Sequence, residues 1–171
     1  MATSDAEPCE FCDSPVGHGD VRDWSMPLTF APAFLDRLGR RLWECVPAAA
    51  PAHLVVLATG GVGMGVAAAL TAPEGRLGSV SVVKRAFDFD SPQLAPAPGE
   101  PVVVLDNSLH SGRSVEAAVK HMTARGVTPS IVLTVFDAAH DCERRARERV
   151  ARDTGVPVSS LAPWADRHAW V

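Results

Sequence analysis

The stretch that most constrains the fold spans residues 101–119. Residues 102–105 form an unbroken aliphatic run, which is typical of a strand buried on both faces of a parallel sheet. The run stops at Asp106, and mostly polar or small residues fill positions 107–114. From Val115 onward apolar residues recur at helical spacing. The stretch therefore predicts a buried strand, a polar loop and a helix.

Strand-like and helical patterns alternate along the rest of the chain. Strands are predicted at 53–58, 78–84, 102–105, 130–136 and 156–161. Helices are predicted at 32–47, 66–70, 115–126 and 142–154. This rhythm predicts an α/β fold with a doubly wound, mainly parallel sheet and helices on both faces. Pro157 places the last strand at a sheet edge, because proline cannot donate to the ladder.

A chain of 171 residues is most simply one domain. Residues 1–30 are punctuated by proline and glycine and keep no hydrophobic period, so we expect an irregular lead-in. Residues 31–162 would form the core and 163–171 a tail.

The formal net charge of −4 argues against a nucleic-acid partner, which needs a basic surface. The densest basic run is interleaved with acidic residues and is interpreted as a solvated helix face; it comprises Arg144, Arg145, Arg147, Arg149 and Arg152. No apolar segment is long enough to span a bilayer, and the polar start does not resemble a signal peptide. We therefore expect no membrane partner and a cytoplasmic location.

Cys9 and Cys12 have the spacing of a thiolate pair that can share a zinc ion. No second pair follows, so a zinc site would have to recruit His18 or Cys45 through folding. Free thiols are the simpler interpretation, and the zinc alternative stays open.

The polar loop after Asp106 has the composition of a phosphate site. A loop at the carboxyl end of a parallel strand, followed by a helix N-terminus, presents backbone N–H groups and a partial positive charge to an anion. Gly112 permits close backbone approach, Ser111 and Ser114 supply hydroxyl groups, and Arg113 supplies a cation. The alternative is an ordinary capped connection between a strand and a helix.

A second glycine-rich segment, residues 59–65, lies between a predicted strand and a predicted helix. Its glycines would let an anion approach bare backbone, or they would let the helix pack tightly on the sheet. The segment alone does not decide between these two alternatives.

Residues 102–114 resemble the phosphoribosyl-pyrophosphate (PRPP) signature of type I phosphoribosyltransferases. The shared pattern is four aliphatic residues, an acidic residue, a second and usually acidic residue, three variable residues, and Thr/Ser-Gly-x-Thr/Ser. The resemblance implies that Asp106 and Asn107 bind the ribose hydroxyls. It also implies a 5′-phosphate site at His110, Ser111, Gly112, Arg113 and Ser114, and a pyrophosphate site at Thr59, Gly60, Gly61, Val62 and Gly63.

The resemblance extends in element order over residues 28–162 and is strongest to the orotate phosphoribosyltransferase branch. Lys84 and Arg85 match a basic ending of the third strand, and residues 155–161 match the last strand of that branch. The family implies PRPP or a nucleoside 5′-monophosphate as ligand, a base-like acceptor, Mg²⁺ held through substrate oxygens, a homodimer, and a small hood formed by the chain ends.

Three departures from the branch affect the predicted chemistry. Asn107 replaces the second acidic residue of the signature, which removes one negative charge from the ribose site. Ala138 stands where the branch has the arginine that pairs with orotate, and residues 86–98 lack the lysines of its mobile catalytic loop. Orotate itself is therefore not the expected acceptor.

The resulting hypothesis is a divergent phosphoribosyltransferase. Asp106 would stabilise positive charge on the sugar, and Lys84 or Arg85 would balance the departing pyrophosphate. His110 would donate to the phosphate, act as an acid or base, or face solvent. Two alternatives remain open: a non-catalytic module that binds PRPP or a nucleotide, and a specialised enzyme of the same fold acting on an unusual acceptor or on a nucleotide.

Overall fold

The computed structural model describes residues 31–48, 50–58, 60–84, 96, 99–137, 141–163 and 165–166. Helices and strands alternate along these residues, as the sequence predicts. The elements in chain order are α2 (Pro32–Cys45), β1 (Ala52–Leu57), α3 (Val62–Thr71), β2 (Leu77–Val83), β3 (Val102–Leu105), α4 (Arg113–Thr123), β4 (Ile131–Phe136), α5 (Asp141–Thr154) and β5 (Val158–Ala162). The lead-in at 1–30, with Cys9 and Cys12, and most of the tail lie outside the described residues.

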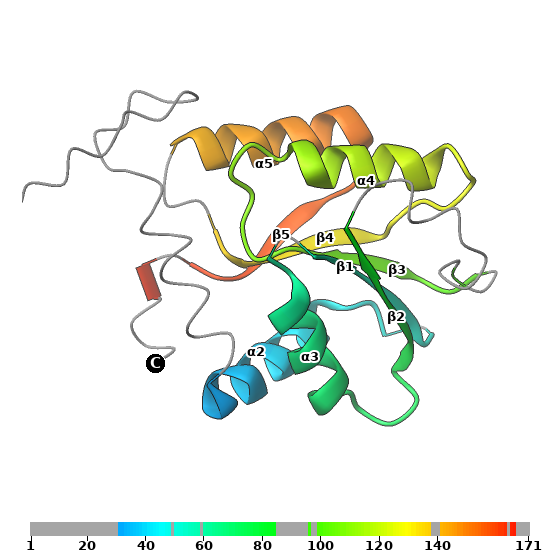
Figure 1. The fold of residues 1–171 in the computed structure, drawn as a ribbon, viewed down its shortest axis with the longest axis vertical. Helices are drawn as coiled ribbons and strands as arrows, with labels where there is room; N and C mark the ends of the chain where they lie inside the picture. Colours follow the sequence, from blue (N-terminus) through cyan, green and yellow to red (C-terminus); the bar gives the residue numbers. More distant parts are fainter. Residues whose placement is uncertain are drawn as a thin grey trace, which may run out of the picture.

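The five strands form one parallel sheet in the order β2-β1-β3-β4-β5 (Figure 1). From the middle of the sheet, β1 is followed by β2 at one edge. The chain then returns to β3, on the other side of β1, and continues through β4 to β5 at the opposite edge. The strand order therefore reverses between β1 and β3, and open α/β sheets bind ligands at the carboxyl ends of strands flanking such a point. The edge position predicted for the last strand is confirmed.

Helices cover both faces of the sheet, which confirms the doubly wound architecture (Figure 1). One core lies between the sheet and α2 with α3, and it contains Leu38, Leu54 and Met64. The other lies beneath α4 and α5 and contains Val104, Val119 and Val150. Because both faces are covered, β3 is buried at all four positions, as its aliphatic run predicts.

Helix α3 begins earlier than the sequence pattern suggests. The prediction placed residues 59–65 in a turn, whereas the helix begins at Val62 and the N–H of Gly65 donates to the carbonyl of Gly61 at 3.0 Å. A Cβ at Gly65 would lie 2.7 Å from Cγ2 of Val56 on β1. Gly65 thus serves close packing of the helix on the sheet.

Helix α5 corrects the interpretation of the basic run as one solvated face. Arg147 lies against the sheet, where its Nη1 donates to Oγ1 of Thr134 at 3.0 Å and also to Oγ of Ser160. Arg149 is partly buried and donates to the carbonyl of Ser111. Three arginines of the run, Arg144, Arg145 and Arg152, are exposed as expected. The helical period places the other two toward the molecule, where backbone and hydroxyl oxygens bind them.

The described helices include none with the length and apolar character that a bilayer crossing requires.

Candidate functional site at the strand-order reversal

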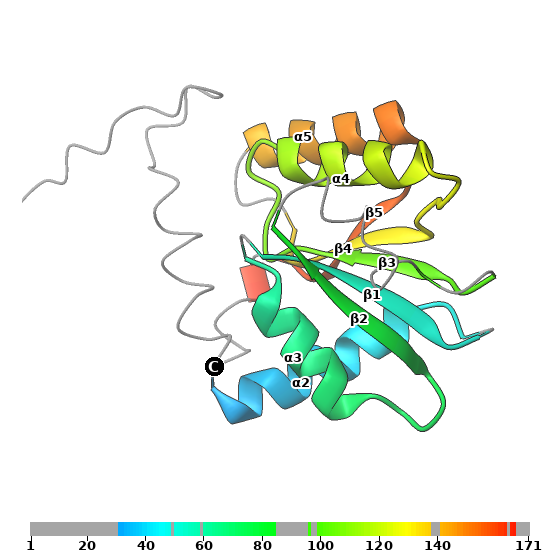
Figure 2. The same ribbon diagram turned by 45° about the vertical axis from the view of Figure 1, so that its right-hand side comes forward.

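Two loops converge where the strand order reverses. The turn between β1 and α3 and the loop between β3 and α4 lie at the same edge of the sheet (Figure 2). A Cβ at Gly61 would lie 2.5 Å from the carbonyl oxygen of Leu105, the last residue of β3. The two segments that the sequence singled out as anion sites are therefore neighbours.

The β3–α4 loop is held by a left-handed glycine and one buried apolar side chain. Gly112 has φ +66° and precedes the first residue of α4, where its carbonyl accepts from the N–H of Glu116 at 2.9 Å. Leu109 is buried and packs with the core beneath α4 and α5. The loop is thus anchored at its middle and at its end.

These loop residues enclose a pocket of about 150 Å³. Ligand pockets for drug-sized molecules usually measure about 300–1,000 Å³, so this one suits a phosphate-sized group. The described residues that line it are Asp106, Ser108, Leu109, His110, Ser111, Gly112, Arg113, Ser114 and Val115. All five residues predicted to hold a 5′-phosphate are among them, together with Asp106.

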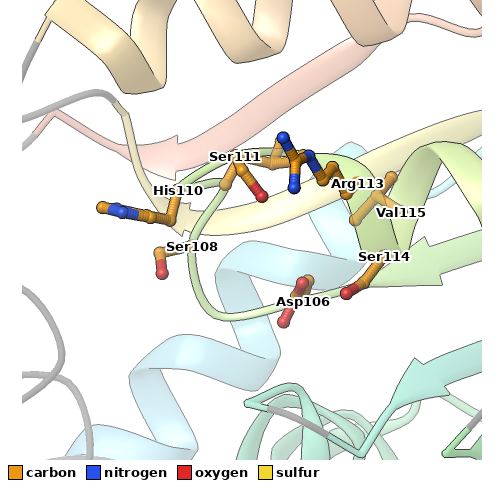
Figure 3. Close-up of a pocket in the computed structure, with 9 residues that line it drawn as sticks. Asp106, Ser108, His110, Ser111, Arg113, Ser114 and Val115 are labelled. Carbon is orange, nitrogen blue, oxygen red and sulfur yellow. The ribbon is translucent and has the colours of Figure 1, made fainter. Parts of the chain in front are cut away.

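Figure 3 shows how the polar side chains lie around the pocket. The Ser114 hydroxyl is directed toward the Asp106 carboxyl group, across the opening that the loop surrounds. The imidazole of His110 is directed away from both. The arrangement favours a binding role for Ser114 and leaves His110 at the rim.

Asp106 is buried, with 6% of its surface exposed. Its own N–H donates to the carbonyl of Leu133 at 3.1 Å, and its Oδ1 accepts from the N–H of Asn107 at 2.9 Å. Burial raises the pKa of Asp106 to about 7, although the hydrogen bond from Asn107 opposes the rise. The carboxyl group therefore changes charge near neutral pH, which is common for groups in functional sites.

Asn107 connects the two loops. A Cβ at Gly60 would overlap the side-chain amide of Asn107, so the β1–α3 turn lies directly against this residue. The carbonyl of Asn107 also accepts from the N–H of Val135 at 3.2 Å. Asn107 thus lies between the predicted phosphate and pyrophosphate segments.

The other predicted site residues are not among the described residues that line the pocket. Lys84 is exposed just after β2 and is not among the described residues that line the pocket. Gly63 is buried in the first turn of α3, and Val62 is exposed. Thr59 and Arg85 lie outside the described residues. The pyrophosphate and charge-balancing roles stay predictions.

The sequence prediction does not assign two of the residues around the pocket to the site. Ser108 falls among the variable positions of the signature, so the pattern carries no information about it. Arg149 contacts the loop from 38 positions away in the chain, through a helix whose charge alternation suggested solvent. Only its place on the inward-turning side of a charged helix distinguishes it.

A resident metal cluster is not found in the part of the chain that the structure describes, where no three His, Cys, Asp or Glu side chains gather. Asp106 is the one carboxylate among the described pocket residues. That donor set fits Mg²⁺ bound mainly through ligand oxygens and waters, because Mg²⁺ retains waters and seldom needs an all-protein cage. Neither Cys45 nor Cys142 forms a disulfide bond within the described residues.

Part of the chain is similar in sequence to curated orotate phosphoribosyltransferases. Orotate phosphoribosyltransferase of Xanthomonas campestris pv. campestris is 32% identical over 76 residues, which cover 42% of this chain and 35% of that protein. The chain thus matches about a third of the length of the curated relatives. No family model matches the sequence.

Solved structures share the fold over most of the chain. Mycobacterium tuberculosis orotate phosphoribosyltransferase in complex with inorganic phosphate has a TM-score of 0.62 at 20% identity, covering 84% of this chain and 79% of that one. The same enzyme in complex with PRPP has a TM-score of 0.58 at 19% identity, covering 89% and 93%.

The fold is that of the type I phosphoribosyltransferases. The partial sequence match and the structural likeness together fit a divergent relative of that family, with orotate phosphoribosyltransferases among the relatives found. The resemblance seen in residues 102–114 is confirmed at this level.

Proposed function

We propose that the protein is a phosphoribosyltransferase, which transfers ribose 5-phosphate between PRPP and a base-like acceptor with pyrophosphate as co-product. One observation carries the proposal: a pocket of phosphate size begins at a buried aspartate and lies beside a glycine turn, at the strand-order reversal. The names of the sequence relatives and structural neighbours support the same reaction class.

The proposed mechanism assigns binding to the loop and charge stabilisation to Asp106. Backbone N–H groups near Gly112, with the hydroxyls of Ser111 and Ser114, would hold the 5′-phosphate at the N-terminus of α4. The ribose would then lie over Asp106, whose ionised carboxylate stabilises positive charge developing at C1′ as pyrophosphate leaves. The glycine turn at 60–63, at the N-terminus of α3, would receive the pyrophosphate.

Magnesium fits this scheme as an ion carried by the substrate. When bound, it would offset negative charge on the pyrophosphate oxygens. The chain would contribute Asp106 and Asn107 through contacts to the ribose hydroxyls. Lys84, just after β2, would add positive charge from the same edge of the sheet.

Thermal unfolding with added ligand tests the proposal. PRPP with Mg²⁺, at about 100 times its dissociation constant, is expected to stabilise the fold by about 2.7 kcal/mol, whereas ribose without phosphate should give no shift. Stabilisation by PRPP would then justify a screen of acceptors for pyrophosphate release. An unchanged melting temperature with PRPP, ribose 5-phosphate and nucleoside monophosphates would refute the proposal.

A second candidate function is a PRPP- or nucleotide-binding regulatory module without catalysis. Asn107 favours it, since an amide in this place supplies less negative charge for a developing cation than a second carboxylate. Tight PRPP binding without turnover across a panel of nucleobases would support the module over the enzyme.

We also expect a homodimer and a cytoplasmic location. Support for the dimer is an exposed apolar stripe on α3, formed by Val62, Val66 and Leu70, beside exposed Val80 and Val82 of β2. Apolar surface of this kind is often covered by a partner. Sedimentation velocity of the wild type and of a Leu70→Glu variant would test it.

A further inference from the structure

Arg149 joins α5 to the back of the β3–α4 loop. Its Nη2 donates to the carbonyl oxygen of Ser111 at 2.5 Å. Its Nε lies 3.4 Å from Oε2 of Glu116, in the first turn of α4. One guanidinium therefore connects α5, the loop and the start of α4, which suits the rigid fork of arginine.

The hydrogen bond to Ser111 determines which way one loop peptide points. The carbonyl of Ser111 and the N–H of Gly112 belong to the same planar trans peptide, so they point in opposite directions. Because the carbonyl faces Arg149 on α5, the N–H of Gly112 points away from α5. Ser111 and Gly112 both line the pocket. In Figure 3 the loop at Ser111 and Arg113 lies between α5 and Asp106, which is also a lining residue.

Close packing against α5 also holds the peptide between Ser111 and Gly112. A Cβ at Gly112 would lie 2.8 Å from Cγ2 of Val150 and 3.5 Å from Nη2 of Arg149. The loop therefore rests directly on α5, and the peptide has little room to rotate while Arg149 is in place.

Arg149 also lies near the negative charge of Glu116, at the start of α4. Glu116 is ionised, since the hydrogen bond from Lys120 at 2.6 Å, with the nearby Arg149 charge as a smaller contribution, lowers the pKa of its carboxyl group. A carboxylate in the first turn of α4 repels an anion bound at that end of the helix. Lys120 binds one of its oxygens, and Arg149 lies near the other.

We propose that Arg149 is a positioning residue for the phosphate of the substrate: by binding the Ser111 carbonyl, it keeps the Gly112 N–H directed into the pocket. The inference rests on the proposed function. Arg149 is not among the described residues that line the pocket, so it acts through the loop rather than by contact with the ligand.

The test compares Arg149→Gln with Arg144→Gln on the same helix. Arg144 is exposed and pairs only with Asp141 and Glu148 among the ion pairs found in the described residues. Calorimetric titration with inorganic phosphate is expected to show about tenfold weaker binding for R149Q, equivalent to about 1.4 kcal/mol, and no change for R144Q. In turnover assays R149Q should raise KM for PRPP by a similar factor and leave kcat within about twofold.

Arg149→Lys keeps the charge but cannot hold two partners with a planar fork. We expect phosphate affinity between that of the wild type and that of R149Q, which also keeps the test valid if R149Q does not fold. Wild-type affinity in R149K would argue that charge alone matters and would overturn the positioning role.

The double variant Arg149→Gln/Glu116→Gln separates peptide orientation from charge. Phosphate binding that stays weak after the carboxylate is removed supports the positioning role, and full recovery overturns it. If the wild type binds neither inorganic phosphate nor PRPP, the proposed function fails along with the inference. If the wild type binds and R149Q binds equally well, the inference alone fails.

Discussion

Replacement of Asp106 by Asn is expected to lower kcat by about 100- to 1,000-fold, the usual cost of removing a group that stabilises developing charge. The substitution keeps the size of the side chain and removes its charge. In the wild type, burial raises the pKa of Asp106 to about 7, so the ionised fraction grows through the neutral range. Wild-type kcat/KM for PRPP should therefore rise with pH around 7, and the residual kcat/KM of D106N should lack this rise.

The same variant is expected to be more stable than the wild type at alkaline pH. Because the pKa of Asp106 is raised in the folded protein, its favourable contribution to stability is complete below the unfolded pKa of about 3.9 and is lost as pH rises through about 7. Melting temperatures without ligand should thus favour D106N most at pH 8, with the difference shrinking toward pH 4.

A matched surface variant controls for general effects of carboxylate loss. Glu148 is exposed on α5 and pairs with Arg144 at 3.3 Å, so Glu148→Ala should leave turnover and its pH dependence unchanged. Equal activity in D106N and E148A would contradict the role assigned to Asp106. A D106N protein that melts below the wild type at pH 8 would contradict the proposed effect of burial.

The sequence predicts the fold of this chain well because its three central strands, β1, β3 and β4, are buried on both faces. Continuous aliphatic runs such as Val102–Leu105 identify such strands directly, and glycine and proline separate them from the helices. The sequence pattern predicts too late a start for α3, because glycines are poor helix formers. Gly65 is nevertheless part of the helix, since the absence of a side chain there lets α3 approach Val56 on β1. Packing against the sheet overrides propensity there.

The candidate site is predictable where it is local in the chain. The loop from Asp106 to Ser114 is contiguous, so its composition alone indicates a pocket for an anion. Contacts between segments that are distant in the chain leave no comparable pattern in the sequence. The support that Arg149 gives to Ser111, and the approach of Gly60 to Asn107, depend on how α5 and α3 pack on the sheet.

Replacement of Gly112 by Ala is expected to weaken phosphate binding by at least about tenfold and to destabilise the fold. Gly112 has φ +66°, a left-handed conformation that costs an L-residue about 1–2 kcal/mol. Its new Cβ would also lie 2.8 Å from Cγ2 of Val150, and overpacking of this kind costs about 1–3 kcal/mol. The peptide whose N–H faces the pocket would have to shift.

Gly126→Ala is the matched control for this change. Gly126 has φ +80°, so alanine is strained there too, but its Cβ would meet no atom within 4 Å. We expect G126A to lose stability by the conformational cost alone and to keep wild-type phosphate affinity, as measured by chemical denaturation and calorimetry.

The double variant Gly112→Ala/Val150→Ala distinguishes the two causes of the expected loss. Removing the Val150 methyl groups relieves the steric overlap but leaves the left-handed conformation strained. Recovery of phosphate affinity would show that α5 sets the position of the loop by contact. Affinity that stays low would assign the loss to the conformation of residue 112. Unchanged affinity in G112A itself would remove the β3–α4 loop from the proposed phosphate site.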